Sequence, residues 1–417
     1  QKPCRSASTC AASERGEAKV QSRTTTTVML GVAQTLAWAS SYYLPAVLAS
    51  AISKDIGIST STVFGAFSVA LLVAAGIGPV AGRRIDRLGG RPVLIASNLV
   101  FAAGLAVLSL STHASHVFAA WALMGLAMGS GLYEAAFATV VRLHGQDARR
   151  AITGITLFAG FASTVGWPLS ACLESTVGWR GACLAWAAMH LLIGLPLNIL
   201  LPHASQAVPA QKSTATAQDV GAGLSPAHQR RAAFLMAYVF AVTWFISTAM
   251  AAHLPELLLA SGATLAAAVG IAALVGPAQV VGRVIEFTFL KRAHPLLSAR
   301  LATLAHPMGA LCLGLIGTSA AAAFAVLHGL GNGILTIAIG TLPLLIFGAK
   351  GYGQRQGFLM VPARIVQAGA PFLFGIAVER WGDGALWFSS MLGLSACLAL
   401  VVMTADMRTA PRAIEAH

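Results

Sequence analysis

Two arginines and a glutamate lie inside long apolar stretches of this 417-residue chain, where a charge is costly unless it is paired or faces water. Arg364 lies near the middle of the stretch 354–378, too deep to reach the membrane surface easily. A buried guanidinium needs a counter-charge, and its planar fork matches the two oxygens of a carboxylate. Arg364 therefore indicates an anion site, and a structural pair with a carboxylate of a neighbouring helix is the alternative.

The other two charges are Glu134 and Arg283. Glu134 follows Tyr133 in the segment GSGLYEAAF, and a buried carboxyl of this kind can carry a proton. It could equally be the buried partner of an arginine and close a gate. Arg283 is followed by Glu286, and both could be structural, because they form a degenerate copy of the charged loop 82–86.

Aromatic and polar side chains recur at helical spacing in three other stretches. Trp38 and Tyr42 are four residues apart and could cradle a small organic body, with Trp244 as their counterpart in the second half of the chain. His328 and Asn332 share a helix face and are expected to line a cavity. Simple packing and hydrogen bonding between helices are the alternative roles for both groups.

The composition places these residues in a membrane protein. The chain is 57% hydrophobic and only 10% charged, with a mean hydropathy of +0.75, whereas soluble domains carry roughly 25% charged residues. Each apolar stretch approaches the ~20 residues that a spanning helix needs, and the stretches are continuously apolar instead of alternating as barrel strands do. We predict an all-α membrane protein with twelve spans, at 28–50, 61–81, 92–112, 117–141, 151–173, 181–201, 232–252, 264–286, 299–317, 319–346, 354–378 and 384–405.

The net charge of +13 is distributed unevenly. Only Lys54, Arg180 and Arg380 fall in the predicted outer loops, while most basic residues lie in the tails and inner loops. This asymmetry predicts that both termini are cytoplasmic and that the protein is a multi-pass protein of the cell inner (plasma) membrane. Attraction to anionic lipid heads explains the positive charge, so no nucleic-acid partner is expected.

A polar stretch divides the chain into two halves. We expect a disordered cytoplasmic tail (1–27), a six-helix bundle (28–201), a cytoplasmic linker (202–231), a second six-helix bundle (232–405) and a short tail (406–417). No nucleotide-binding loop, catalytic triad or metal-ligand cluster is evident. We therefore expect no cofactor, no metal and no enzymatic activity.

The two halves repeat each other in sequence. Three patterns recur in the same order at a similar offset: Gly82-Arg83-x-Ile85-Asp86 with Gly282-Arg283-x-Ile285-Glu286, Met124-Gly125-x-x-x-Gly129 with His328-Gly329-x-x-x-Gly333, and Gly166-x-Pro168 with Gly369-x-Pro371. Such parallel repeats predict two pseudo-symmetric bundles. Their glycine-rich faces allow helices to approach closely.

A charged loop between the second and third apolar stretches carries Gly82, Asp86, Arg87, Gly89 and Arg91. It resembles the signature Gly-x-x-x-Asp-Arg-x-Gly-x-Arg between helices two and three of the major facilitator superfamily. Gly90 fills the variable position between Gly89 and the last arginine, Arg91. The resemblance implies the major facilitator fold, secondary transport of a small molecule by alternating access, a monomeric state, and a cavity lined by helices one, four, seven and ten.

Within that fold, Asp86 is expected to pair with Arg142 at the end of helix four and to cap helix eleven. The pair Gly282-Arg283 resembles one in helix eight of monocarboxylate-type facilitators, where the arginine binds the substrate carboxylate. The preferred function is therefore proton-coupled symport of an organic anion such as a monocarboxylate. Arg364 and Arg283 would bind the anion, and Glu134 and His328 are the candidate proton groups.

Two rival functions remain. Proton-coupled efflux antiporters for drugs or metabolites carry a Gly-Pro-x-x-Gly-Gly pattern in helix five, but here Trp167 separates Gly166 from Pro168 and the closing glycines are missing. The second rival function is that of a membrane receptor that kept the fold but lost transport, and no feature of the sequence favours it.

Overall fold

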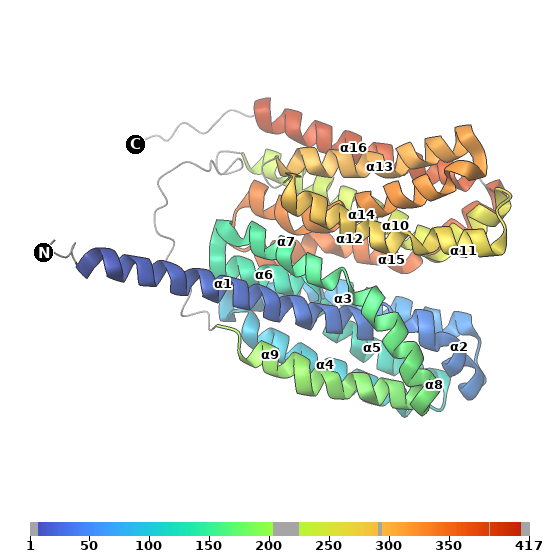
Figure 1. Ribbon diagram of the computed structural model, residues 1–417, viewed down its shortest axis with the longest axis horizontal. Helices are drawn as coiled ribbons and strands as arrows, with labels where there is room; N and C mark the ends of the chain where they lie inside the picture. The colour runs from blue at the N-terminus through green and yellow to red at the C-terminus, as the bar shows by residue number, and fades with distance from the viewer. Residues whose placement is uncertain (1–6, 203–224, 291–293, 383, 410–417) are drawn as a thin grey trace, which may run out of the picture.

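The chain folds into two helical bundles that lie side by side (Figure 1). The computed structural model describes residues 7–202, 225–290, 294–382 and 384–409, and every regular element within these ranges is helical. The first helix begins, and the last helix ends, at the same end of the molecule, which we call the terminal end; the opposite one is the far end. The all-α prediction is confirmed.

Ten helical elements and one short turn make up the first bundle. They are α1 (Ala7–Ser40), α2 (Leu44–Ile56), α3 (Thr60–Leu88), α4 (Gly90–Ser109), α5 (Ala114–Gly131), α6 (Tyr133–His144), η1 (Gly145–Ala148), α7 (Arg149–Ala159), α8 (Ala162–Met189), the π-helical turn η2 (His190–Gly194) and α9 (Leu195–Ile199). The breaks between α1 and α2, α5 and α6, and α7 and α8 fall inside predicted spans. Conversely, α8 contains a kink at Gly178 (φ 73°), and this kink separates two predicted spans.

The second bundle is simpler. It contains α10 (Pro226–Ala260), α11 (Leu265–Ala273), α12 (Val275–Thr288), α13 (Pro295–Ile316), η5 (Gly317–Ala320), α14 (Ala321–Phe347), α15 (Tyr352–Trp381) and α16 (Gly384–Thr409). Eight stretches of the described residues are long and apolar enough to cross a membrane, and the two longest, Ala114–Ile199 and Pro295–Phe347, each contain more than one predicted span. The helices thus accommodate the twelve predicted spans.

The segments outside the bundles differ in part from the sequence-based expectation. Helix α1 already begins at Ala7, so much of the segment 1–27 that was predicted to be disordered is helical. Its sequence offers no proline after Pro3, and Ala, Glu, Lys and Arg favour helix. Helix α10 begins at Pro226, capped by Ser225, inside the predicted linker 202–231. Residues 203–224 and 410–417 lie outside the described part of the chain.

Glycines set equivalent contacts in the two bundles. A Cβ added to Gly125 or Gly129 of α5 would meet the backbone of α3 at Ala70 or Ala74, and one added to Gly329 of α14 would meet the backbone of α12 at Val275. Gly333 of α14 lies against Gln279 of α12 in the same way. The repeated Gly-x-x-x-Gly patterns therefore position the second helix against the fourth and the eighth against the tenth.

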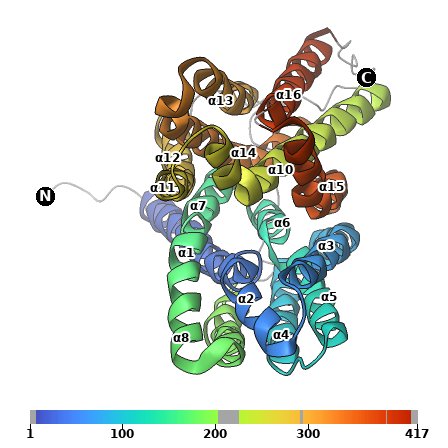
Figure 2. The same cartoon turned by 90° about the vertical axis from the view of Figure 1, so that its right-hand side faces the viewer.

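The two bundles meet along α3 and α15, which run side by side (Figure 2). At the terminal end, Gly82 of α3 packs on the backbone of Gly353 in α15, and Gly78 packs on Gly357 one turn further in. Only a hydrogen atom fits at Gly82, so the sequence motif that contains this glycine fixes how closely the halves can approach.

The carboxylate of Asp86 caps α15 from the other bundle. The N–H groups of Gly353 and Gln354 donate to its two oxygens at 2.9 and 2.8 Å. The N-terminal turn of a helix has unpaired N–H groups and a partial positive charge, which a carboxylate stabilises. The predicted cap is confirmed. The predicted pair with Arg142 is wrong, because both Asp86 oxygens are used by α15 and no ion pair joins these two described residues.

We expect Gly82→Ala to destabilise the contact between the bundles. The added methyl group would overlap the backbone of Gly353, which cannot move aside as a flexible side chain can, and overpacking of this kind costs about 1–3 kcal/mol. The matched control is Gly76→Ala on the same helix, where a Cβ meets nothing within 4 Å. Thermal unfolding of the purified protein in detergent measures the difference, and equal melting temperatures for the two variants would contradict the assignment.

Candidate functional site

A buried ion pair joins the two bundles. Nη2 of Arg364 on α15 lies 2.7 Å from Oε1 of Glu134 on α6, and the two side chains are only 5% and 13% exposed. Nη1 of Arg364 donates to Oε1 of Gln367 at 2.9 Å. The structure therefore brings together the arginine and the glutamate that were singled out separately in the sequence.

A break in the fourth span places Glu134 at this point. The extended backbone of Leu132 (φ −82°, ψ −164°) interrupts the helix, so α6 starts afresh at Tyr133 and Glu134 lies in its first turn. The positive end of the new helix favours a carboxylate there. The carbonyl of Gly131, left at the end of α5, accepts a hydrogen bond of 2.6 Å from Nε2 of the buried Gln34 on α1.

Aromatic rings surround the ion pair. Trp38 on α1 and Trp244 on α10 lie parallel, with ring centroids 6.2 Å apart. The guanidinium carbon of Arg364 lies 5.9 Å from the Trp38 ring and 5.1 Å from the Trp244 ring, within reach of cation–π attraction. Tyr42 and Tyr133 contact the Trp38 ring at 5.3 and 4.8 Å between centroids. These four aromatic residues, of which helical spacing had indicated Trp38 and Tyr42, share one site with Arg364 and Glu134.

Two further polar residues complete this site. Nε2 of Gln367 donates to the hydroxyl of Tyr42 at 3.1 Å, and that hydroxyl lies 3.4 Å from Oγ1 of Thr248 on α10. The sequence analysis did not identify Gln367 or Thr248. A signal was available, because Gln367 lies three residues after Arg364 and Thr248 four after Trp244, each on the face of a residue already chosen.

Arg283 approaches the same region from α12. It is buried, and it crosses to the other bundle, where its Nη1 occupies the space in which Gly160 at the end of α7 has no side chain. Nε and Nη1 have no hydrogen-bond partner among the described residues.

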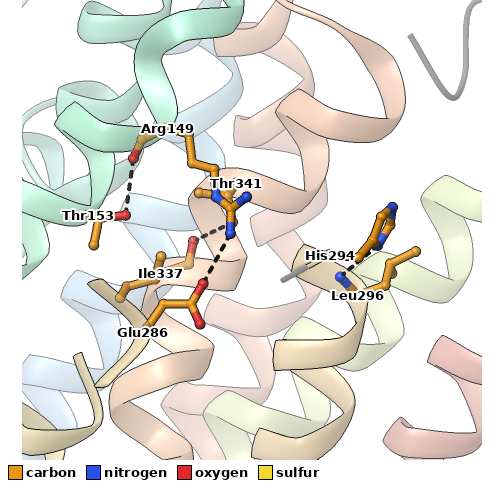
Figure 3. Close-up of polar contacts among 7 residues, drawn as sticks. All are labelled: Arg149, Thr153, Glu286, His294, Leu296, Ile337 and Thr341. Atoms are coloured by element: carbon orange, nitrogen blue, oxygen red, sulfur yellow. Dashed lines mark hydrogen bonds and ion pairs between the residues drawn. The ribbon is translucent and has the colours of Figure 1, made fainter. Parts of the chain in front are cut away.

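The carboxylate nearest to Arg283 in sequence is engaged elsewhere. Glu286 pairs with Arg149 of α7 at 3.3 Å, and Thr153 holds the backbone of Arg149 in place (Figure 3). This contact joins the bundles near the terminal end. Among the described residues, no carboxylate pairs with the buried Arg283.

His328 and Asn332 lie elsewhere, in a pocket inside the second bundle. Nδ1 of His328 lies 3.1 Å from Nδ1 of His306 on α13, and Nε2 of His306 lies 3.0 Å from Oγ of Ser389 on α16. Asn332 donates to Oγ of Ser247 on α10 at 2.9 Å. His328 and Asn332 therefore line a pocket, as expected, and they also form hydrogen bonds between helices. None of these contacts reaches Arg364.

Comparison with known proteins identifies the family. The sequence model of the Major Facilitator Superfamily matches residues 30–361. The chain belongs to the major facilitator superfamily. It is a multi-pass membrane transporter and not an enzyme. The described residues contain no cluster of three or more side chains that could hold a metal ion.

Solved structures agree on the fold. The human organic anion transporter MFSD10 matches with a TM-score of 0.66 at 18% identity, over 91% of this chain and 99% of that one. The proton:xylose symporter XylE matches with a TM-score of 0.72 at 12% identity, over 92% and 96% of the two chains. The fucose:proton symporter FucP of E. coli matches with a TM-score of 0.66 at 15% identity, over 92% and 97%. At these identities the likeness shows the fold alone.

One curated relative shares detectable sequence. The 4-hydroxybenzoate transporter PcaK of Pseudomonas putida is 26% identical over 165 residues, which cover 38% of this chain. The match spans 36% of the relative's length.

The Arg364–Glu134 pair predicts a non-additive effect on stability. Removing one partner of a buried pair leaves the other charge uncompensated and costs about 3–5 kcal/mol, whereas replacing both costs far less. Glu134→Gln should be the more damaging single change, because arginine cannot discard its charge whereas Glu134 can bind a proton. Thermal unfolding of Glu134→Gln, Arg364→Met and the double variant tests this. A double variant as unstable as the sum of the two losses would show that the residues are not coupled.

Proposed function

We propose that this transporter moves a small organic anion, such as a monocarboxylate, together with protons. The observation that carries the proposal is the buried and uncompensated guanidinium of Arg283. A charge held in a membrane interior without a partner is costly and marks a binding or transport pathway. A substrate carboxylate would supply the missing negative charge and would accept hydrogen bonds from Nε and Nη1.

The balance of charges supports a single negative charge on the substrate. Arg364 is neutralised by Glu134, and Glu286 by Arg149, so the buried groups retain one positive charge, that of Arg283. A monovalent anion would bring the region to neutrality. A cationic solute would add to the net positive charge of these buried groups. This argues against the efflux of cationic drugs as the main activity.

Proton coupling would act through Glu134. While its carboxylate is ionised, it occupies Nη2 of Arg364. Protonation weakens this pair and frees the guanidinium for a substrate carboxylate, so that proton and anion enter together. Arg283 would attract the anion, and Arg364 would then supply a second guanidinium to bind its carboxylate. The names of two relatives, a 4-hydroxybenzoate transporter and an organic anion transporter, are in keeping with such a substrate.

The positive-inside asymmetry supports a plasma-membrane protein with a cytoplasmic terminal end. The loop with Gly82, Asp86, Arg87 and Arg91 would then act as the cytoplasmic gate, closed by the cap on α15 and by the Arg149–Glu286 pair. A single chain encloses the whole site, which is in keeping with a monomer.

Uptake into proteoliposomes tests the proposal. Purified protein is reconstituted with a pH dye inside, and labelled lactate, pyruvate and 4-hydroxybenzoate are compared with cationic drugs, with protein-free liposomes as the blank for passive leakage. We expect carboxylate uptake with acidification of the interior, lost in Arg364→Ala. Transport of cationic drugs alone would reject the proposal in favour of efflux.

Arg283→Ala should weaken carboxylate binding by about tenfold or more, the equivalent of one charged hydrogen bond of about 1.5–3 kcal/mol. Because the change removes an uncompensated charge, the free energy of unfolding should not fall. Gly160→Ala is the companion variant: its methyl group would displace the flexible end of Arg283 while keeping the guanidinium. Initial uptake rates give KM for both variants, and an unchanged KM in Arg283→Ala would contradict its role.

Glu134→Gln should separate anion movement from proton movement. The amide cannot release a proton, so counterflow exchange of labelled for unlabelled carboxylate should persist while accumulation driven by a pH gradient disappears. Both are measured in the same liposomes, with Glu174→Gln on the helix α8 as the matched control outside the site. Full pH-driven accumulation in Glu134→Gln would exclude it as the proton carrier.

A further inference from the structure

The two tryptophans of the central site form an unusual pair. Trp38 belongs to α1 and Trp244 to α10, so each half of the transporter contributes one ring. The ring planes are parallel, with an interplanar angle of 0°. Alternating access moves the halves against each other, and the distance between these two rings would change with that motion.

The spacing of the rings is too small for a third ring in this state. A flat ring held between two others needs about 7 Å between the planes of the outer rings, since each stacking contact takes about 3.5 Å. The two centroids lie 6.2 Å apart, and the distance between parallel planes cannot exceed the distance between their centroids. A separation of the halves would have to open the pair before a ring could enter.

The polar atoms of the pair are also unused. The indole N–H groups of Trp38 and Trp244 are both buried and neither has a hydrogen-bond acceptor among the described residues. A buried donor without an acceptor is unfavourable, and tryptophan usually finds a partner for its N–H. Trp121 in the core of the first bundle also has an unpartnered N–H, but only at Trp38 and Trp244 do two such donors lie together beside Arg364, where a ligand with oxygen atoms would satisfy them.

Arg364 completes the arrangement. Its guanidinium carbon lies 5.1 Å from the Trp244 ring and 5.9 Å from the Trp38 ring. In a benzoate-like acid the carboxylate is attached directly to the ring and lies near its plane. A ring placed between the tryptophans could therefore turn its carboxylate to Arg364, and the edges of Tyr42 and Tyr133 would enclose it.

We propose that the substrate is a planar aromatic monocarboxylate whose ring is held between Trp38 and Trp244. This inference rests on the proposed transport of an organic anion and narrows its substrate class. The two stacking contacts would distinguish a flat ring from a saturated one of similar size. The carboxylate would take the place of Glu134 on Arg364, and a ring hydroxyl or carboxylate oxygen would accept from the indole N–H groups.

A matched pair of ligands tests the proposal. Benzoate and cyclohexanecarboxylate have the same charge and carbon count, but only benzoate has a flat aromatic ring. Isothermal titration of the purified protein in detergent measures affinity without interference from passive permeation of the acids. We expect benzoate to bind about tenfold more tightly, the equivalent of two aromatic contacts, and acetate more weakly than either.

Variants connect the preference to the two rings. Trp38→Phe and Trp244→Phe keep an aromatic face and should retain a preference for benzoate. Trp38→Leu and Trp244→Leu should bring the two affinities together. The control is Trp381→Leu on α15, a residue that is 56% exposed and outside the site, which should change neither affinity. The Phe variants keep the test informative if a Leu variant fails to fold.

The outcomes separate this inference from the proposed function. Equal affinity for benzoate and cyclohexanecarboxylate would overturn the aromatic assignment and leave anion transport intact. A preference for benzoate that survives in both Leu variants would also overturn it. Absence of binding of every carboxylate would overturn the proposed function as well.

Discussion

The ion pair between Arg364 and Glu134 is the contact on which the centre of the molecule depends. A guanidinium at this depth is tolerable only with a counter-charge, and the counter-charge comes from the other half of the chain. The break before α6, the support of Gln34 and the position of Gln367 all serve to hold the two groups at hydrogen-bond distance. Because each half supplies one partner, any ligand or proton that separates them also loosens the halves.

The surrounding packing is consistent with such motion. Glycines of α5 and α14 hold helices tightly within each bundle, and Gly82 and Gly78 allow α3 and α15 to meet across the bundles. At the terminal end this meeting is reinforced by polar contacts that can open as a unit, the Asp86 cap and the Arg149–Glu286 pair. Rigid bundles joined by a few separable contacts are what alternating access requires.

Charge and shape at the centre point to the same kind of ligand. Arg283 has no carboxylate partner among the described residues, and the two parallel tryptophans leave two buried N–H donors without an acceptor there. The His306–His328 network, by contrast, satisfies its members within one bundle and holds α13, α14 and α16 together. The arginines of the central site and the two histidines are all polar residues within apolar stretches of the sequence, yet their surroundings differ. The arginines lie on helices that face the junction of the halves, whereas the histidines bond within one bundle.

The sequence by itself determined the helical class, the approximate spans, the internal repeat and the identity of most residues at the centre. Hydrophobic length and helical spacing are local properties, so the shared face of Trp38 and Tyr42 could be predicted from the chain alone. The Asp86 cap on helix eleven followed instead from the fold that the family resemblance implies. Only the tertiary structure decided partners. Arg364 and Glu134 are 230 residues apart, Asp86 gives its oxygens to α15 and not to Arg142, and His328 turns away from the site, because pairing across bundles depends on how whole helices pack. Sequence spacing carries no information about that arrangement.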